Sequence, residues 1–399
     1  MSDKKIDREG RKMIEFFIAF RHIVERKFQS FFSILGVAIA ITVFIVSLTV
    51  SNGLEKHMIN SLLTLSPHIL IKNKVDTQIE NYAEIEEKLK NINGVKSIIP
   101  EIDTQAIVKF NDFAKGVLAS GISSENAKND MDLKMVKGNN DISELNSILI
   151  GEEFSKEMLL EVGDELSLVS AENKELKLIV RGIFKTGFLQ YDSNLVIVPL
   201  TTMQILSERG EVVTQIGIKT SQPQKVENIL SEVRKTVDSY DYFAVSWKQT
   251  NQTLLNAVQF EKFVLVAILS LLLIIACFAV SVILNMIVRE KIKDIGILKS
   301  VGYTNANIRN IFTIEGLIIG IFGMVIASIL SPLILLALKK FFKIYMSNSL
   351  YYLDELPLYI SGGELAIVYV TTFVIVFLST IYPAARAAKM KPVEALKYE

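Results

Sequence analysis

Charged and apolar side chains are interleaved from Val288 to Tyr303. Near the end of this stretch, Gly302 is of a residue type that commonly terminates a helix. Its charged or small members are Glu290, Lys291, Asp294, Gly296 and Lys299, and its apolar stripe is Ile292, Ile295, Ile297 and Leu298. This pattern predicts an amphipathic helix that docks on the surface of a partner and takes no part in catalysis. The alternatives are a solvated connector and a helix that packs on its own chain.

The residue types that usually catalyse reactions or bind metals form no recognisable group. His22, His57 and His68 lack the spacing of zinc ligands, and we expect structural or exposed roles for them. Cys277 is the only cysteine, so we expect a small buried apolar residue. Glu84, Glu86 and Glu87 are expected on a solvated helix face.

No Gly-x-x-x-x-Gly-Lys-Ser/Thr loop occurs in the chain. We therefore expect no cofactor on this chain, and ATP with its magnesium on another. The 43 basic residues balance the 43 acidic ones, and no basic stripe indicates a nucleic-acid partner.

Half of the 399 residues are hydrophobic, and they are concentrated in a few long stretches. Four stretches contain no Asp, Glu, Lys or Arg and exceed the roughly 20 residues that a helix needs to cross a bilayer. Lys and Arg near the span ends are roughly twice as frequent on the side that contains both termini, which predicts cytoplasmic termini. The predicted order is a cytoplasmic amphipathic segment (1–27), a first span (28–54), an extracytoplasmic domain (55–262), a second span (263–288), a cytoplasmic coupling segment (289–315), a third span (316–338), a short outer loop (339–364), a fourth span (365–385) and a cytoplasmic tail (386–399).

Within the membrane part, small residues recur at helical spacing, and they predict close packing of helices. These are Gly36 with Ala40 in the first span and Gly316 with Gly320 in the third. Before the first span, Met13, Phe16, Phe17, Phe20, Ile23, Val24 and Phe28 form an apolar helical face. This face predicts a helix lying in the cytoplasmic membrane interface, with packing on the chain's own spans as the alternative.

The domain between the first two spans is expected to be mixed α/β. Alternating or continuous apolar runs predict strands at 105–110, 116–122, 165–170, 176–184, 195–199 and 213–220. Helical patterns occur at 79–92, 152–160, 201–209 and 223–237. The segment 171–174 is expected to join two strands as a short hairpin turn.

Two segments resemble a known family. The block from Val288 to Tyr303 is similar to the "V-x-E-K-x-x-D-I-[AG]-I-L-[KR]-x-[LM]-G" segment of FtsX-like and MacB-like ABC permeases, with Val301 in place of Leu or Met. The tail from Tyr382 to Glu399 resembles the closing motif of that family. Segments near Asn52, Gly151, Asp192 and Trp247 are similar to lipoprotein-releasing (Lol) permeases of the LolC/LolE type.

The resemblance implies four transmembrane helices and a MacB-like periplasmic core, in the bacterial inner membrane. It implies a dimer with a second, identical or different, permease chain, and a cytoplasmic LolD-like ABC ATPase into which Glu290, Lys291, Asp294, Ile295, Gly296, Lys299 and Gly302 would dock. By mechanotransmission, such a transporter extracts lipoproteins and passes them to a periplasmic carrier. A lateral gate would lie on Phe44, Ile45 and Leu48 of the first span and Phe263, Val266 and Leu271 of the second, unless these residues face lipid.

One feature departs from the carrier-recruiting Lol subunit, in which a protruding hook loop interrupts the corresponding hairpin. Residues 171–174 leave little room for such a loop. The alternatives to lipoprotein release are a MacB-like efflux permease for peptides or amphiphiles and an FtsX-like signal relay to a periplasmic hydrolase.

Overall fold

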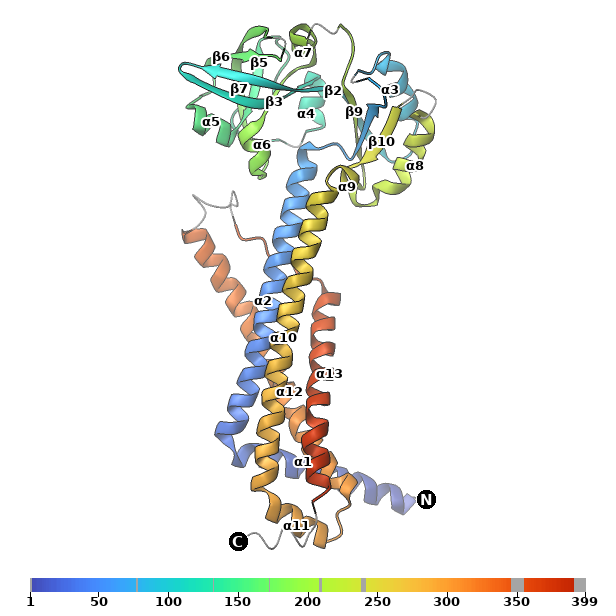
Figure 1. The fold of residues 1–399 in the computed structure, drawn as a ribbon, viewed down its shortest axis with the longest axis vertical. Coiled ribbons are helices and arrows are strands. Elements are labelled where there is room, and N and C mark those ends of the chain that lie inside the picture. The colour runs from blue at the N-terminus through green and yellow to red at the C-terminus, as the bar shows by residue number, and fades with distance from the viewer. Residues whose placement is uncertain are drawn as a thin grey trace. The chain divides into compact units, whose positions relative to one another are not determined.

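The computed structural model describes residues 2–76, 78–131, 133–171, 173–207, 210–237, 242–345 and 355–390, with side chains from residue 13 onward (Figure 1). Residues 391–399, the last part of the closing motif, lie outside these ranges, as does the segment 346–354. The chain divides into two compact units. One contains residues 1–54, 259–347 and 354–399, and the other contains 55–258 and 348–353.

The first unit, which we call the membrane unit, is helical, and most of its helices are long. They are α1 (Ser2–Glu25), α2 (Lys27–Leu65), α10 (Gln252–Glu290), α11 (Ile292–Ser300), α12 (Asn305–Tyr345) and α13 (Gly362–Ala388). Of these, α2, α10, α12 and α13 are long and apolar enough to cross a membrane. Both α2 and α10 are longer than the uncharged stretches that we used to delimit the spans, because charged residues such as Glu55 and Lys262 continue a helix as readily as apolar ones do.

Small residues bring two helices of this unit close together. A Cβ at Gly316 would overlap the side chain of Thr380, and one at Gly320 would lie 2.7 Å from Val376. Both partners are on α13, so these glycines let α12 approach it closely. Ala40 is buried, whereas a Cβ at Gly36 would meet no other atom of this chain. Cys277 is buried in the hydrophobic core of the membrane unit, as expected.

The second unit is a mixed α/β domain around one long strand. Its strands are β1 (Ile69–Asn73), β2 (Val95–Phe110), β3 (Phe113–Ile122), β4 (Lys134–Gly138), β5 (Ser147–Gly151), β6 (Glu165–Val169), β7 (Glu175–Lys185), β8 (Leu195–Pro199), β9 (Gln215–Thr220) and β10 (Tyr242–Ser246). The first half of β2 pairs with β9, in an open sheet of order β10-β1-β9-β2. Its second half pairs with β3 and β6. Pairing continues through β8, β5 and β7 and returns to β6, so these strands close a small barrel.

Helices cover these strands. They are α3 (Tyr82–Lys90), α4 (Ser124–Asn129), α5 (Glu152–Met158), α6 (Leu189–Asn194), α7 (Leu200–Ser207), the 3-10 turn η1 (Pro223–Lys225), α8 (Val226–Val237) and α9 (Trp247–Thr250). The expected helix at 79–92 begins only at Tyr82, because Ile79 pairs with Val213 in an isolated bridge and Asn81 is left-handed (φ 51°). Glu84 and Glu86 form ion pairs with lysines one turn later on α3, as a solvated face predicts.

All six predicted strands are present, but β1, β4, β5 and β10 were not predicted. They are short, and β5 (Ser147–Gly151) is buried along its whole length. Such a run has no alternation that a sequence pattern could reveal. The hairpin between β6 and β7 is tight, as expected: the Ser170 amide donates to the Lys174 carbonyl (2.8 Å), and Asn173 is left-handed (φ 62°).

Asp192 stabilises the connection between β7 and α6 by hydrogen bonds. Its buried carboxylate accepts hydrogen bonds from the Thr186 amide (2.8 Å), the Thr186 hydroxyl (2.9 Å) and the Gly187 amide (3.1 Å). Burial raises the pKa of Asp192, and the hydrogen bonds from Thr186 and Gly187 oppose this shift. The Asp192 backbone also lies where a Cβ on Gly151 would be, so β5 and α6 meet here.

We expect Asp192→Ala to lower the Tm of the α/β domain by about 6 to 12 °C, because it leaves buried amide donors without an acceptor. The single tryptophan, Trp247, is buried in this domain, so its fluorescence reports the unfolding of the domain within the full chain. Asp112→Ala, at an exposed turn, is the matched control and should change the Tm by less than about 2 °C. Equal effects of the two variants would contradict this role of Asp192.

Candidate functional site

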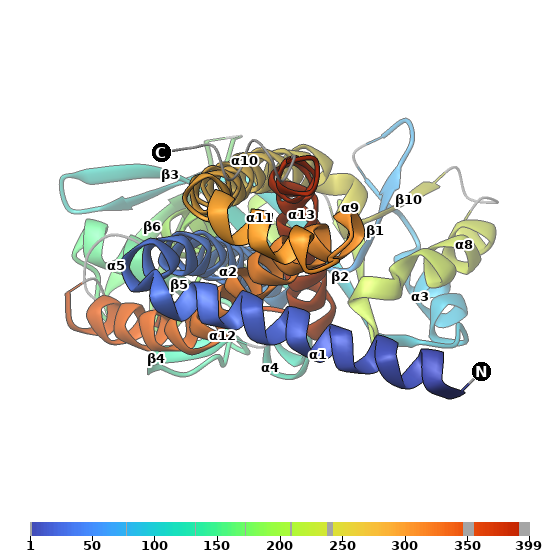
Figure 2. The ribbon, with the colours of Figure 1, turned by 90° about the horizontal axis from the view of Figure 1, so that it is seen from below.

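The helix α11 lies between α10 and α12 at the end of the membrane unit (Figure 2). It begins after a break at Lys291 (φ −94°, ψ 18°). It ends as the sequence indicates: Gly302 is left-handed (φ 99°), its amide donates to the Lys299 carbonyl (3.1 Å), and the Tyr303 amide donates to the Leu298 carbonyl (3.0 Å). This is a Schellman cap, in which glycine carries no steric penalty.

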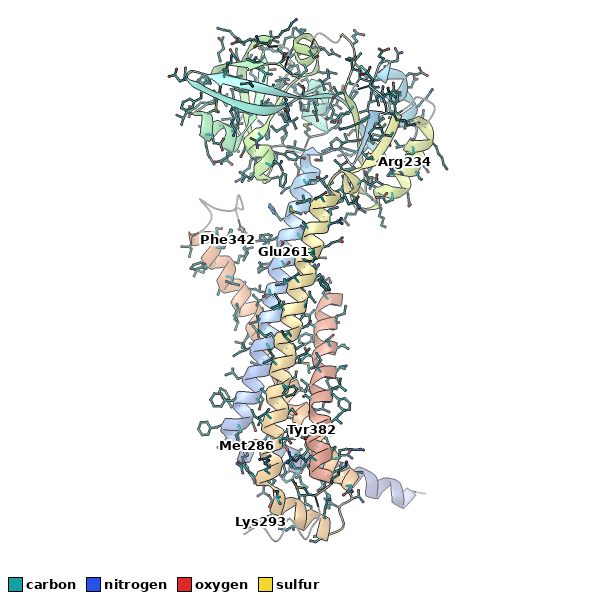
Figure 3. All side chains as sticks on the ribbon, in the orientation of Figure 1. Arg234, Glu261, Met286, Lys293, Phe342 and Tyr382 are labelled. Carbon is teal, nitrogen blue, oxygen red and sulfur yellow. The ribbon has the colours of Figure 1, made fainter. Side chains whose placement is uncertain are left out.

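The apolar stripe of α11 is divided between two surfaces. Ile295 and Gly296 are buried, and Ile295 belongs to the core of the membrane unit. Ile297 is 54% exposed and Val301 is 76% exposed. Lys293 and Asp294 are exposed as well, and Figure 3 shows Lys293 at this end of the unit. One side of α11 therefore packs on its own chain, and the other presents apolar and charged side chains outward.

Ion pairs connect α1 to the start of α11. Arg26 forms an ion pair with Glu290, and Lys291 Nζ lies 2.8 Å from Glu25 Oε2 and 3.0 Å from Asp294 Oδ2. The hydrogen bond from Lys291, together with one from Arg21, lowers the pKa of Glu25 to about 2. Glu290 and Lys291, which the resemblance places against an ATPase, thus have partners within this chain.

Lys299 connects α11 to the end of α13. Its Nζ donates to the carbonyl oxygens of Ala388 (2.7 Å) and Met390 (2.6 Å) and to Asn305 Oδ1 (2.8 Å). Desolvation lowers the pKa of Lys299. Because the last carbonyls of a helix lack intrahelical donors, a lysine at this position also stabilises the end of α13.

The contacts between α1 and α12 were not predicted. Glu15 accepts hydrogen bonds from Asn307 (2.7 Å) and Asn310 (3.4 Å), and His22 Nδ1 lies 3.4 Å from the buried Glu315. Glu15, Ala19 and His22 follow one another at helical spacing, which is the signal that could have revealed this face.

The apolar residues of α1 that we used to predict an interfacial helix mostly point away from these contacts. Met13 is 73% exposed and Phe17 is 63% exposed, whereas Ile23 is buried. The face with Glu15 and His22 packs on α12, in agreement with the alternative of packing on the chain's own spans. The position of the exposed apolar face in the membrane interface remains a prediction.

A second set of contacts in the membrane unit joins α2 to residues 355–361, which we call the strap, and joins α2 and α10 to the start of α13. A Cβ at Gly53 would overlap the Pro357 carbonyl oxygen. The Tyr359 amide donates to the Thr49 carbonyl (3.1 Å). Glu364, at the start of α13, accepts a hydrogen bond from Asn52 Nδ2 (2.9 Å) and lies 3.7 Å from Lys262 Nζ of α10.

The residues expected to form a lateral gate lie in different environments. The three from the first span (Phe44, Ile45 and Leu48) are buried in the core of the membrane unit. Phe263 and Leu271 of α10 are 70% and 59% exposed, and Val266 is partly buried against the core. The gate remains a prediction, and within this chain only its α10 part is open to a partner.

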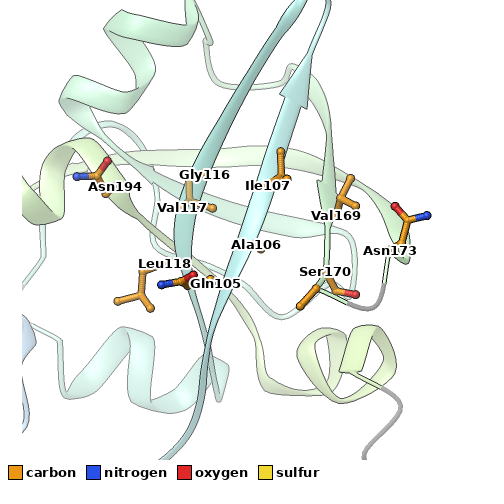
Figure 4. Close-up of a pocket in the computed structure, with 11 residues that line it drawn as sticks. Gln105, Ala106, Ile107, Gly116, Val117, Leu118, Val169, Ser170, Asn173 and Asn194 are labelled. Atoms are coloured by element: carbon orange, nitrogen blue, oxygen red, sulfur yellow. The ribbon is translucent and has the colours of Figure 1, made fainter.

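The barrel carries a shallow cavity of about 660 Å³ next to the tight hairpin at 170–174 (Figure 4). It is lined by Ile107 of β2, by Gly116 and Leu118 of β3, and by Ser170 and Asn173 of the hairpin, among others. No loop projects from the described residues of this hairpin. Among the described residues of the chain, no three or more His, Cys, Asp or Glu side chains gather in a way that could hold a metal ion.

Comparisons with known proteins cover both units. The MacB-like periplasmic core domain family matches residues 30–236, and the FtsX-like permease C-terminal family matches residues 264–392. The chain is 27% identical to the lipoprotein-releasing system transmembrane protein LolC of Neisseria meningitidis, over 97% of this chain and 99% of that protein. It is 25% identical to LolE of Haemophilus influenzae over 92% of this chain and 93% of the relative.

Among solved structures, the periplasmic region of MacB from Actinobacillus actinomycetemcomitans is similar to 50% of this chain. The match covers 98% of that structure, with 14% sequence identity and a TM-score of 0.36.

We expect Gly53→Ala to release the strap, because the added methyl group would occupy the position of the Pro357 carbonyl oxygen. Gly36→Ala is the matched control, since it changes a glycine of the same helix that faces open space. Replacing glycine by alanine in a helix ordinarily stabilises it by about 1 kcal/mol. Hydrogen exchange of residues 355–361 in the detergent-solubilised chain should accelerate at least about tenfold in Gly53→Ala and stay unchanged in Gly36→Ala. Equal exchange in both variants would show that the close approach does not hold the strap.

Proposed function

Since the chain belongs to the FtsX-like ABC permeases with a MacB-like periplasmic core domain, we propose that it releases lipoproteins from the inner membrane, driven by a separate cytoplasmic ATPase. It is a multi-pass membrane subunit with a periplasmic domain, and it is a permease rather than an enzyme. The observation that carries the proposal is the similarity to LolC along 97% of the chain. A similarity of this extent includes the domain, the spans and the segment between α10 and α12.

In this proposal, two permease chains act together and the ATPase holds ATP and magnesium. Closure of the ATPase pushes on the exposed face of α11, which carries Ile297 and Val301. Its buried face is joined to α1 through Lys291 and to α13 through Lys299, so displacement of α11 moves several helices together. The function of α11 is mechanical, and the ion pairs of Glu290 and Lys291 stiffen the connection.

The lipoprotein enters between two permease chains, where the exposed side chains of α10, such as Phe263, are available to acyl chains. The hairpin at 170–174 is too short for a hook, so handover to a carrier uses another surface or another subunit. A partner permease chain that carries the hook accounts for this difference.

The direct test of lipoprotein release is depletion of the protein in its native host. We expect outer-membrane lipoproteins to accumulate in the inner membrane, as measured by immunoblots of the separated membranes. Complementation by the plasmid-borne wild-type gene should restore sorting. If sorting stays normal while the protein is demonstrably absent, efflux of amphiphiles or signal relay would replace lipoprotein release.

The docking role of α11 can be tested separately. We expect Ile297→Asp to reduce ATP-driven release from proteoliposomes at least about tenfold, because it places a charge on an apolar contact with the ATPase. Ile297→Leu, which preserves the apolar contact, should retain release. Co-purification of the ATPase measures docking directly, and full binding by Ile297→Asp would rule out this face.

A further inference from the structure

In the periplasmic domain, the long strand β2 changes its pairing partner within a stretch of three residues. Glu101 is the last residue paired with β9, opposite Gln215, and Ile102 is the first paired with β3, opposite Gly121. The open sheet and the barrel are therefore joined through the backbone of Glu101, Ile102 and Asp103. Any rotation of one sheet against the other must bend the strand here.

Two carboxylates face the same side of β2 at this point, because side chains alternate along a strand. Gln215 Nε2 lies 2.7 Å from Glu101 Oε1 and 2.7 Å from Asp103 Oδ2, so one neutral amide group donates to both. Thr214 adds backbone contacts: its amide donates to the Glu101 carbonyl (3.0 Å), and its hydroxyl accepts from the Asp103 amide (3.0 Å). Thr214 and Gln215, at the start of β9, are therefore hydrogen-bonded to both Glu101 and Asp103, the first and last residues of the changeover, the segment 101–103 where β2 changes its partner.

The surroundings supply little compensation for two negative charges. Glu101 is 3% exposed and Gln215 is 6% exposed. Ser120 lies directly opposite Asp103 on β3, and its hydroxyl group, like Lys72 and Gln215, opposes the effect of burial on the pKa of Asp103 only in part. Both carboxylates line a cavity of about 160 Å³ whose wall includes Leu118, Tyr191 and Trp247.

The other titratable groups around this pair come from β1, β9 and α6. Lys72 and Lys219 favour the ionised form of Glu101, and Lys219 Nζ also donates to the Thr64 carbonyl (2.6 Å). The pKa of His68 is lowered to about 4 by burial and by Lys219, so His68 is neutral at neutral pH. The Tyr191 hydroxyl is hydrogen-bonded to the Ser66 hydroxyl (2.6 Å), and burial raises the pKa of Tyr191, so Tyr191 is neutral as well.

Burial and the charge of Asp103 raise the pKa of Glu101 well above its ordinary value, and burial raises that of Asp103. Carboxylates that share a buried site cannot both ionise without strong repulsion, and they titrate as a pair. A proton on either Glu101 or Asp103 removes this repulsion while the hydrogen bonds of Gln215 remain.

We propose that Glu101, Asp103 and Gln215 form a proton-dependent clamp at the crossing of the two sheets. With one proton on the carboxylate pair, the clamp is closed and β2 is held straight against β9 and β3. When the last proton leaves, the two carboxylates repel each other across Gln215, and the open sheet and the barrel gain freedom to move against each other. The position of this clamp makes the internal motion of the periplasmic domain responsive to periplasmic pH.

The sign of the effect on stability follows from linkage. A carboxyl group whose pKa is raised by folding binds its proton more tightly in the folded chain, so the free energy of unfolding falls as the pH rises from the unfolded pKa to the folded one. Glu101→Gln keeps a neutral group at this position and removes the proton-dependent step. The variant and the wild type should therefore be most alike below about pH 4.5, the ordinary value for glutamate.

The experiment uses the full chain in detergent, with urea unfolding followed by Trp247 fluorescence and hydrogen exchange of residues 100–104 and 213–217. Relative to the wild type, Glu101→Gln should gain up to about tenfold in the folding equilibrium constant for each pH unit above pH 4.5, until the wild-type pair is fully ionised. Over the same range, its exchange at these segments should become slower than that of the wild type at the same pH. Glu80→Gln, at an exposed position, should follow the wild type throughout.

Asp103→Asn provides an independent variant if Glu101→Gln fails to fold. It removes one of the two charges that repel each other, so its stability should depend less on pH than that of the wild type, while burial still raises the pKa of Glu101. A constant difference from the wild type at every pH would overturn the proposal, since it would mean that these residues only contribute hydrogen bonds. Identical profiles for the wild type and both variants would overturn it as well.

Discussion

The apolar interior of a bilayer excludes unpaired charge, and this constraint determines where the membrane unit can be joined by polar contacts. The middle of the spanning helices is joined by packing, as in the close approach of Gly316 and Gly320 to α13, and by a neutral hydrogen bond between the hydroxyls of Ser328 and Tyr369 (2.6 Å). The ion pairs are displaced to the helix ends. Lys291 and Glu25 join α11 to α1 at one end, and Lys262 and Glu364 join α10 to α13 at the other.

The periplasmic domain uses a different connection. Its two sheets share β2, so a single continuous backbone passes from the open sheet into the barrel. The ladder hydrogen bonds run perpendicular to β2, so its backbone continues through the changeover while its pairing partners differ on either side. Glu101 and Asp103 lie at this changeover, where both accept hydrogen bonds from Gln215.

The similarity to LolC and LolE extends over nearly the whole chain. The hairpin at 170–174 is closed by hydrogen bonds between its described residues, such as the one from the Ser170 amide to the Lys174 carbonyl. The cavity beside it is lined by residues that include Gly116. In the function that we propose, a partner permease chain that carries the hook would recruit the carrier.

The amino-acid sequence by itself determined the four spans, the mixed α/β domain, the tight hairpin and the helix stop at Gly302, because each follows from a local pattern of hydrophobicity, charge or glycine. It identified Glu290, Lys291 and Lys299 but not their partners. Only the tertiary structure decided that these residues contact α1 and α13, that Glu15 and His22 face α12, and that Glu101 meets Gln215 from a strand more than a hundred residues away. Such contacts depend on how distant elements pack, and a local pattern contains no information about the partner. The short strand β5 was missed for a related reason: buried on both faces, it has no periodicity, and its pairing with β7 and β8 alone defines it.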